Sequence, residues 1–198
     1  MKISRYFDSA ILKPNMTEDE VKQAIKDCIA CDSYTVCVRP CDIALAVEMC
    51  KGTNTKVSCV LDFPHGDSTA EGKAALAELY APTGVAEIDM VMNYGYARSG
   101  KWDEVKRGIA GVVKAAKKHG VGVTVIFETC ELTEEEIRKG TEICIEAGAD
   151  FVKTSTGFAA SGASMEAVST MLDEAKGRIK VKPSGCIRNY ETAKKYVD

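Results

Sequence analysis

Two patterns of apolar residues alternate along the chain. Short and nearly continuous apolar runs, bounded by glycine, proline or charged residues, are typical of buried strands. Between them, apolar residues recur at intervals of three and four, as Val21, Ile25 and Cys28 do, which indicates amphipathic helices. Thr17 and Glu20 lie just ahead of that series at the spacing of a capping box, which predicts where the helix begins.

These patterns predict strands that alternate with helices. Strands are expected at residues 3–7, 34–38, 56–61, 87–92, 121–127, 151–153 and 180–182, the first of them weak. Helices are expected at residues 17–29, 42–50, 69–80, 103–119, 133–147, 165–175 and 190–197, with a long loop at 93–101. Such an order predicts a parallel sheet that helices cover.

Two architectures fit this order, a doubly wound open sheet and a (β/α)8 barrel. A residue able to take part in chemistry stands at the end of nearly every strand: Asp8, Cys37, Asp62, Asp89, Glu128, Lys153 and Lys182. A barrel collects its site from many strand ends, whereas a doubly wound sheet concentrates it at one switch point. The sequence also has no GxGxxG or Walker A motif. We therefore predict an α/β fold, a (β/α)8 TIM barrel formed as a single domain by residues 1–198, with only seven strands evident.

Composition excludes several classes of protein. The formal net charge of −3, with no basic run interleaved with aromatic residues, argues against nucleic-acid binding. No apolar stretch approaches the length of a transmembrane helix, so no membrane association is expected. The nine cysteines are scattered, and only two histidines accompany them, so neither a disulfide framework nor a zinc site is predicted. Free thiols are typical of a cytoplasmic protein.

Lys153 and Lys182 each end a short apolar strand, and each leads into a loop that contains serine and glycine. A lone lysine at a strand end commonly extends its ammonium group to water. Two such lysines on adjacent strands of a barrel would enter the same mouth, where burial and like charge lower the pKa of one amine. An amine with a lowered pKa attacks carbonyl carbons, so the pair predicts a Schiff-base site.

Asp89 lies in the middle of an apolar strand. By alternation Glu87, Asp89 and Val91 face one side of the sheet, while Ile88 and Met90 face the other. A buried carboxylate requires a cation nearby, which the two lysines could supply. We interpret Asp89 as an acid–base catalyst, with a structural ion pair to one of the lysines as the alternative.

Glycine-bearing loops follow the last two strands, at residues 154–157 and 184–186. Backbone N–H groups in such turns can bind phosphate, although glycine after a strand is more often only a turn. His65 and Cys37 are predicted at the same rim of the barrel, and we interpret both as structural or peripheral.

Several motifs together resemble one known family. They are Asp8 with Leu12-Lys13-Pro14, Val36-Cys37-Val38-Arg39-Pro40, Phe63-Pro64-His65-Gly66, Glu87-Ile88-Asp89-Met90-Val91, and the segments 126–133, 146–157 and 181–188. With these motifs in this order, the chain is similar to the deoxyribose-phosphate aldolase family over its whole length. The resemblance implies a class I aldolase on a (β/α)8 barrel that needs no metal or other cofactor. Such an enzyme reversibly cleaves 2-deoxy-D-ribose 5-phosphate to D-glyceraldehyde 3-phosphate and acetaldehyde.

The resemblance also implies roles for individual residues. Lys153 matches the Schiff-base lysine, Lys182 the second lysine that perturbs it, and Asp89 the acid–base carboxylate. The implied substrate-binding residues are Asp8, Cys37, Thr156, Gly157, Gly185 and Cys186, of which Gly157 and Gly185 match the phosphate pocket. The partners expected from the family are a small phosphosugar, an aldehyde and, in a homodimer, a second copy of the chain.

The sequence departs from the family at three points. Cys186 stands where the family usually has a second glycine, and a residue with a side chain presents its backbone N–H less freely to phosphate than glycine does. Ala10 stands where a threonine is common. The family continues into an eighth strand, so we expect the sequence to be C-terminally short, or another chain to cover that place. Two other functions therefore stay open: a related Schiff-base aldolase with another aldehyde or phosphosugar, and a non-catalytic paralogue acting in binding or assembly.

Overall fold

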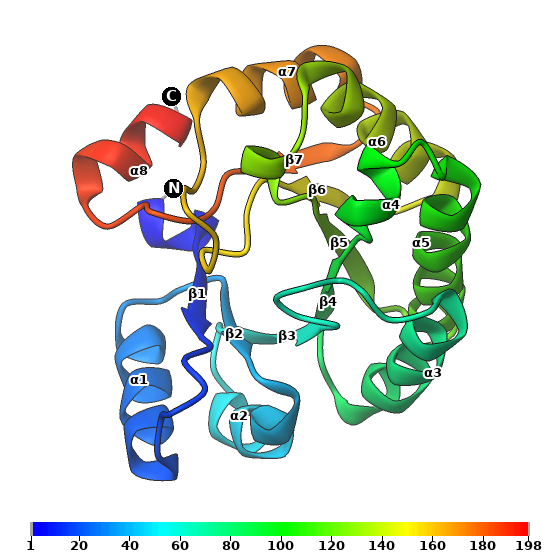
Figure 1. Ribbon diagram of the computed structural model, residues 1–198. Coiled ribbons are helices and arrows are strands. Elements are labelled where there is room, and N and C mark those ends of the chain that lie inside the picture. Colours follow the sequence, from blue (N-terminus) through cyan, green and yellow to red (C-terminus); the bar gives the residue numbers. More distant parts are fainter. Residues whose placement is uncertain (1, 198) are drawn as a thin grey trace.

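A parallel sheet of seven strands forms the centre of the structure, a computed structural model that describes residues 2–197. The strands are β1 (Asp8–Ile11), β2 (Thr35–Val38), β3 (Lys56–Leu61), β4 (Glu87–Val91), β5 (Gly122–Ile126), β6 (Phe151–Lys153) and β7 (Lys180–Lys182). Each strand pairs in parallel with the next one along the chain. Figure 1 shows the sheet curled, with helices around the outside. The predicted barrel-type α/β fold with seven strands is thereby confirmed.

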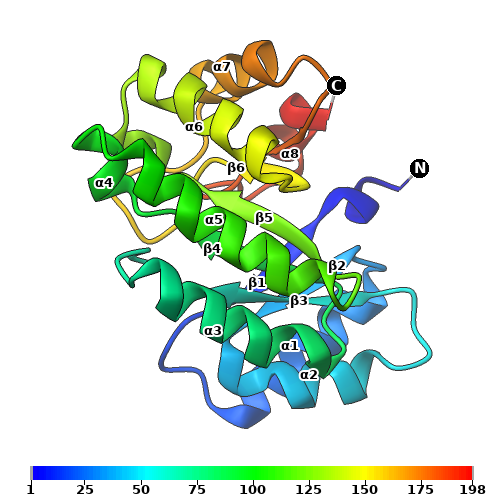
Figure 2. The same ribbon diagram turned by 90° about the vertical axis from the view of Figure 1, so that its right-hand side faces the viewer.

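The helices cover the outer face of the sheet, as Figure 2 shows for α3, α5 and α6. They are α1 (Glu18–Ala30), α2 (Ile43–Cys50), α3 (Ala70–Tyr80), α4 (Tyr94–Arg98), α5 (Trp102–Lys117), α6 (Glu134–Ala147), α7 (Met165–Ala175) and α8 (Tyr190–Val197). Short 3-10 helices η1 (Ile3–Tyr6), η2 (Pro40–Asp42), η3 (Ala81–Thr83) and η4 (Thr129–Glu131) lie between them. The predicted capping box of Thr17 and Glu20 begins α1, and Thr133 with Glu136 forms a second one at α6.

Alternation along the strands sorts their side chains into two sets. On β4, Ile88 and Met90 are fully buried in the apolar core that lies between the sheet and the helices. Glu87 and Asp89 point to the other side, into the interior of the curled sheet, where they meet lysines from β6 and β7. The face predicted for Asp89 is therefore the interior face.

The first strand lies later in the chain than predicted. Residues 3–6 form η1, and the strand begins at Asp8, which is the register partner of Thr35 on β2. Arg5 accounts for the difference, because its guanidinium donates a hydrogen bond to the carbonyl oxygen of Ser33 at 2.9 Å and anchors η1. Asp8 therefore starts its strand instead of ending it.

The segment 93–101, predicted as a loop, contains the short helix α4. Asn93 caps this helix, because its side-chain oxygen accepts the N–H of Tyr96 at 2.9 Å. Gly100, with a φ of +71°, follows its last turn. A helix of this length has no room for an apolar repeat, so periodicity does not reveal it.

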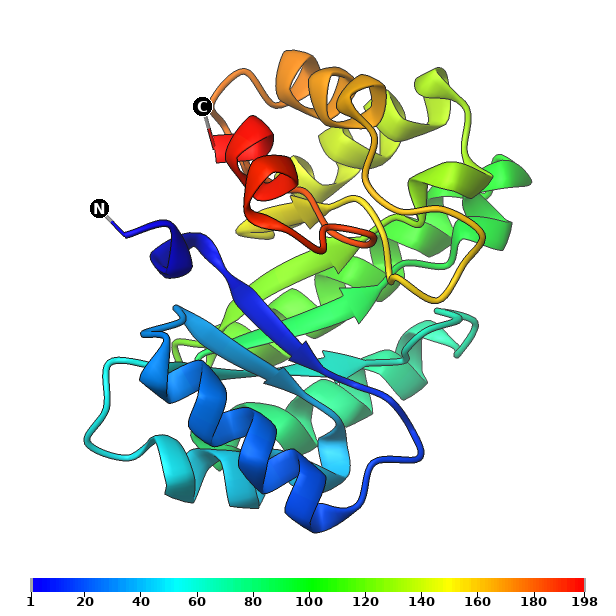
Figure 3. The ribbon, with the colours of Figure 1, turned by 90° about the vertical axis from the view of Figure 1, so that its left-hand side faces the viewer.

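The two edges of the sheet, among the described residues, are β1 and β7. Figure 3 shows β1 at the near side, with α1 below it and α8 above it. The α8 helix lies next to η1, so the two ends of the described chain are close together. Across the interior, Nζ of Lys182 on β7 lies 2.5 Å from Oδ2 of Asp8 on β1. An ion pair thus links the two edge strands that no backbone ladder joins.

A second buried ion pair holds the loop that follows β3. Lys73 of α3 contacts the carboxylate of Asp62 and donates to the carbonyl oxygens of Gly66 and Val91 at 2.9 and 2.8 Å. Gly66 has a φ of +68°, and a Cβ there would overlap the carbonyl oxygen of Met92, so only glycine fits. Lys73 thereby ties this loop to the end of β4.

No helix of the described residues combines the length and the apolar character that crossing a membrane requires. All nine cysteines lie in the described part of the chain, and none of them forms a disulfide. Cys50, Cys59 and Cys144 are buried, where a thiol packs as a small apolar side chain.

We predict that Lys73→Ala lowers the free energy of unfolding by about 3–5 kcal/mol, because it leaves the Asp62 carboxylate buried without its cation. Urea denaturation followed by circular dichroism measures the change. The control is Lys106→Ala, which removes an exposed partner of Glu146 and is expected to have a far smaller effect. Equal effects of the two substitutions would contradict the prediction.

Candidate active site

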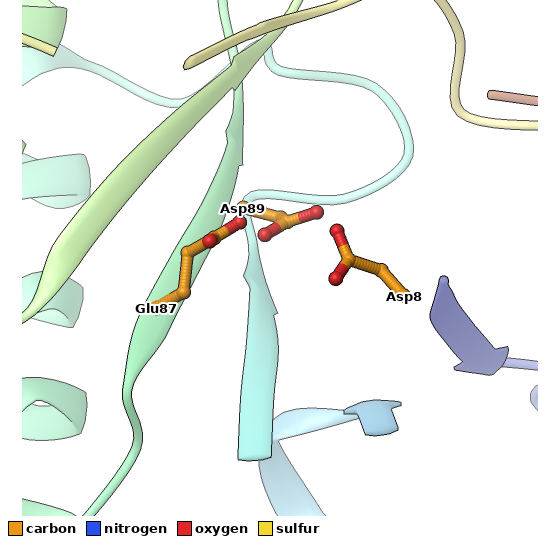
Figure 4. A group of neighbouring side chains, drawn as sticks. All are labelled: Asp8, Glu87 and Asp89. Atoms are coloured by element: carbon orange, nitrogen blue, oxygen red, sulfur yellow. The ribbon is translucent and has the colours of Figure 1, made fainter. Parts of the chain in front are cut away.

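Three carboxylates converge in the interior of the curled sheet. Asp8 comes from β1, Glu87 and Asp89 come from β4, and one oxygen of each lies within 4.8 Å of the others. Figure 4 shows the three groups together, with the carboxylates of Asp8 and Asp89 turned toward each other. Asp89 is fully buried, and Glu87 is 6% exposed. Removing three carboxylates from water is costly unless cations neutralise them.

Lys182 neutralises two of these carboxylates. Its Nζ lies 2.5 Å from Oδ2 of Asp8 and 2.5 Å from Oε1 of Glu87. Hydroxyl groups also contact both carboxylates, because Thr124 donates to Glu87 at 2.7 Å and Thr35 donates to Asp8 at 2.6 Å. Burial by itself lowers the pKa of Lys182, but the three surrounding carboxylates outweigh it, and the pKa lies well above its ordinary value.

Lys153 pairs with the third carboxylate. Its Nζ donates to Oδ2 of Asp89 at 2.6 Å, and both side chains are almost completely buried. Lys153 and Lys182 are register partners on adjacent strands, so both enter the same interior, as the sequence predicts. We call Asp8, Glu87, Asp89, Lys153 and Lys182 the interior cluster.

The pKa of Lys153 is raised, and the prediction that it would be lowered is wrong for this state of the protein. Burial lowers it, but the neighbouring groups that favour the ammonium form, Asp89 first among them through its charge and its hydrogen bond, together outweigh burial and the repulsion from Lys182. Conversely, burial raises the pKa of Asp89, but the two ammonium groups bring it below its ordinary value. The prediction weighed burial and the like charge of the second lysine, and it did not count the opposite charge of Asp89, although it expected that carboxylate beside the lysines. In this arrangement the Lys153 amine is held as an ammonium ion.

The protonation state of Glu87 sets the net charge of the interior cluster. With all of its groups ionised, the cluster has three negative and two positive charges. The pKa of Glu87 is raised to about 7, chiefly by burial. The negative charge of nearby Asp89 also raises this pKa, and its effect is larger than the lowering caused by Lys182. A proton kept on Glu87 makes the cluster neutral. Sequence reasoning did not single out Glu87, although alternation placed it on the same face as Asp89.

A grouping of three carboxylates could also coordinate a cation such as a divalent metal ion. Here the ammonium groups of Lys153 and Lys182 contact all three carboxylates and supply the positive charge. A metal ion would have to displace both ammonium groups, so the residues present fit amine chemistry better than metal coordination.

The two glycine-bearing loops beyond β6 and β7 touch each other. Gly157 and Gly185 have φ values of +84° and +82°, and a Cβ on Gly185 would lie 3.4 Å from Cα of Gly157. Ser184 donates its N–H to the Thr154 hydroxyl at 3.0 Å, and that hydroxyl lies 3.1 Å from the Ser184 carbonyl oxygen. The structure therefore joins the two predicted phosphate-binding loops into one surface beyond the lysines.

Cys186 is exposed and has a φ of +60°. This left-handed conformation costs a residue with a Cβ about 1–2 kcal/mol, and glycine adopts it freely. The strain thus lies at the position where the sequence departs from the glycine typical of the family it resembles.

The remaining predicted residues lie in different environments. Cys37 is 1% exposed, and burial raises the pKa of its thiol to about 12, so the group stays protonated beside Asp89. Thr156 donates its hydroxyl to Glu128. His65 is exposed, and Asp62 pairs with Lys73 outside the interior cluster, so neither joins the lysines.

A curled parallel sheet with two lysines paired to three carboxylates on its inner face defines the class, a (β/α)-barrel protein with a buried lysine–carboxylate site. A model of DeoC/LacD family aldolases matches residues 3–197. The chain belongs to this family of aldolases, which are lyases.

Relatives and solved structures agree with this assignment. A protein named deoxyribose-phosphate aldolase from Caldanaerobacter subterraneus subsp. tengcongensis is 45% identical over 199 residues, covering 100% of this chain and 86% of that protein. The solved structure of an aldolase named QR15 has a TM-score of 0.94 and 40% identity, covering 100% of this chain and 87% of its own. The deoxyribose phosphate aldolase from Aeropyrum pernix has a TM-score of 0.88 and 28% identity, over 96% and 80% of the two chains.

The raised pKa of Glu87 predicts a specific pH dependence of stability. Between the unfolded value near 4.5 and the folded value of about 7, the folded state binds more protons than the unfolded state, so this group's contribution to stability falls as pH rises. We therefore expect the free energy of unfolding of the wild type, relative to Glu87→Gln, to decline across this interval. Chemical denaturation at a series of pH values measures it.

The matched control for this titration is Glu146→Gln. Glu146 is exposed, and its hydrogen bond with Lys106 lowers its pKa, so the wild type should show no decline relative to this variant. A flat difference between the wild type and Glu87→Gln would refute the assignment of the proton to Glu87.

Proposed function

We propose that the chain is a class I aldolase that reversibly cleaves 2-deoxy-D-ribose 5-phosphate to D-glyceraldehyde 3-phosphate and acetaldehyde through an imine on Lys153. The observation that carries the proposal is the 2.6 Å contact of the buried Lys153 amine with Asp89, beside the ammonium of Lys182. Membership in the DeoC/LacD family supports it, as do the relatives named deoxyribose-phosphate aldolase.

The first step requires a neutral amine. The Lys153 ammonium can pass its proton to Asp89, with which it shares a hydrogen bond, while Lys182 keeps its positive charge nearby. The amine then attacks the C1 aldehyde carbon of the open-chain sugar, Asp89 returns its proton to the hydroxyl group of the resulting carbinolamine, and water leaves to form an iminium ion. The Lys153 amine is thus protonated and oriented before the substrate binds, and its proton has to move to Asp89 before the amine can react.

In the second step the bond between C2 and C3 of the sugar breaks. A water molecule held by Asp89 and Lys182 removes the proton of the C3 hydroxyl, and the electron pair of the broken bond moves into the iminium at Lys153. Glyceraldehyde 3-phosphate leaves, C2 of the enamine takes up a proton, and water hydrolyses the resulting iminium to acetaldehyde and the free amine.

The proposal assigns one group of residues to the reacting carbons of the sugar and another group to its phosphate. The proposal places Asp8 and Cys37 around the reacting carbons, because both lie in the interior near Lys153 and Lys182. It places the phosphate on the surface made by the two touching loops, with Thr156, Gly157, Gly185 and Cys186. Backbone N–H groups at left-handed turns are suited to bind an anion there.

Intact mass after incubation with 2-deoxyribose 5-phosphate and borohydride tests the proposal. We expect one reduced, substrate-derived adduct on the wild type, because borohydride fixes the imine as a stable secondary amine. We expect none on Lys153→Ala. Lys106→Ala, which removes an exposed lysine, should retain the adduct.

Absence of an adduct on the folded wild-type protein would refute the aldolase proposal and leave a non-catalytic role. An adduct that forms equally well with unphosphorylated deoxyribose would instead indicate a related Schiff-base aldolase with another substrate.

We also propose that the chain works as a homodimer with the phosphosugar and the aldehyde as its small-molecule partners. Family resemblance supports a homo-oligomer, and the solved structure of the Aeropyrum pernix relative is described as tetrameric. Light scattering is expected to give twice the mass of one chain. The mass of a single chain would contradict the dimer.

A further inference from the structure

Glu128 is a buried acidic residue that none of these steps uses. It lies beyond the end of β5, is 2% exposed and has φ and ψ of +57° and +63°. A residue with a Cβ loses about 1–2 kcal/mol in this left-handed region, and burying a polar group adds a further cost. Such an arrangement persists only where the surrounding contacts compensate. The contacts of Glu128 therefore indicate its role.

The closest of these contacts lead to the loop that follows β6. Thr156 donates its hydroxyl to Oε2 of Glu128, and its backbone N–H lies 3.3 Å from the same oxygen. The hydroxyl oxygen of Thr156 in turn accepts the N–H of Phe158 at 3.0 Å. The backbones are joined as well, because Thr129 donates its N–H to the carbonyl oxygen of Thr154 at 2.9 Å. Glu128 thus fixes both the conformation of the loop and its place beside β5.

The fixed loop begins directly after Lys153. Gly157 on this loop approaches Gly185 on the next loop, which is the surface assigned above to the phosphate. The hydroxyl of Ser155 is buried there without a hydrogen-bond partner among the described residues. The position of the Thr156–Gly157 turn therefore decides how far a bound phosphate lies from the Lys153 amine.

We propose that Glu128 is a positioning residue that holds the Thr156–Gly157 turn for the phosphate end of the substrate. This inference rests on the function proposed above. Glu128 acts through Thr156, because its carboxylate is turned to that residue's hydroxyl and N–H. Glu128 acts as a hydrogen-bond acceptor and not through its charge. The Thr156 hydroxyl and N–H need an acceptor oxygen, whereas a negative charge by itself would repel phosphate.

Three variants separate the acceptor from the charge. Glu128→Gln keeps an oxygen at the same reach and removes the charge. Glu128→Asp keeps the charge but withdraws the oxygen by one methylene group, and aspartate tolerates the left-handed backbone. The control Glu131→Ala removes a carboxylate from the same turn, where it is 40% exposed and faces Arg98.

The measurements are kcat and KM for 2-deoxyribose 5-phosphate and for unphosphorylated deoxyribose, and the Kd of inorganic phosphate by calorimetry. We expect Glu128→Asp to raise the KM for the phosphorylated sugar and the Kd of phosphate about tenfold, the upper end of the effect of one lost hydrogen bond. Its kcat/KM for deoxyribose should change less than about twofold. Glu128→Gln and Glu131→Ala should stay close to the wild type in every measurement.

Several outcomes would overturn the proposal: an unchanged KM and Kd in Glu128→Asp, an equal loss with both sugars, or the same loss in Glu128→Gln. Absence of phosphate binding by the wild type would overturn it as well. If Glu128→Asp does not fold, Glu128→Asn, which also withdraws the oxygen by one methylene group and tolerates the left-handed backbone, must give the phosphate-specific loss. If the wild type forms no trappable imine, the proposed function fails, while the phosphate titrations still decide the role of Glu128.

Discussion

The structure depends on the mutual neutralisation of carboxylates and ammonium groups inside the curled sheet. Asp8, Glu87 and Asp89 could not be withdrawn from water without Lys153 and Lys182, and the two lysines could not be buried without them. These side chains come from β1, β4, β6 and β7, so the charges can pair only if the sheet curls until its two edges face each other. The Asp8–Lys182 contact is the point at which this curl closes across the interior.

The same neutralisation sets the starting state of the proposed reaction. Contact with Asp89 orients the Lys153 amine and keeps it protonated, so in the proposed mechanism the amine becomes a nucleophile only when that proton moves. Lys182 is held by two other carboxylates, and its pKa lies well above its ordinary value. Two lysines in one interior can therefore take different roles, because their carboxylate partners differ in number and position.

Buried charged side chains also hold the loops at the rim. Lys73 ties the loop after β3 to the end of β4 through Asp62 and backbone carbonyl oxygens. Glu128 ties the loop after β6 to the end of β5 through Thr156. The hydrogen bonds between strands end where the strands end. Beyond that point, these buried side chains hold the loops around the site in fixed positions.

The sequence by itself determined the order of strands and helices, the limits of segments such as 56–61 and 165–175, and the face of β4 that carries Asp89. These features follow from local periodicity and capping, which neighbouring residues specify. Only the tertiary structure decided that Asp8 starts its strand and reaches Lys182, that Glu87 belongs to the interior cluster, and that the pKa of Lys153 rises. The reason is physical: charge pairing and burial depend on distances across the barrel, between residues far apart in the chain, and periodicity along the chain does not encode those distances.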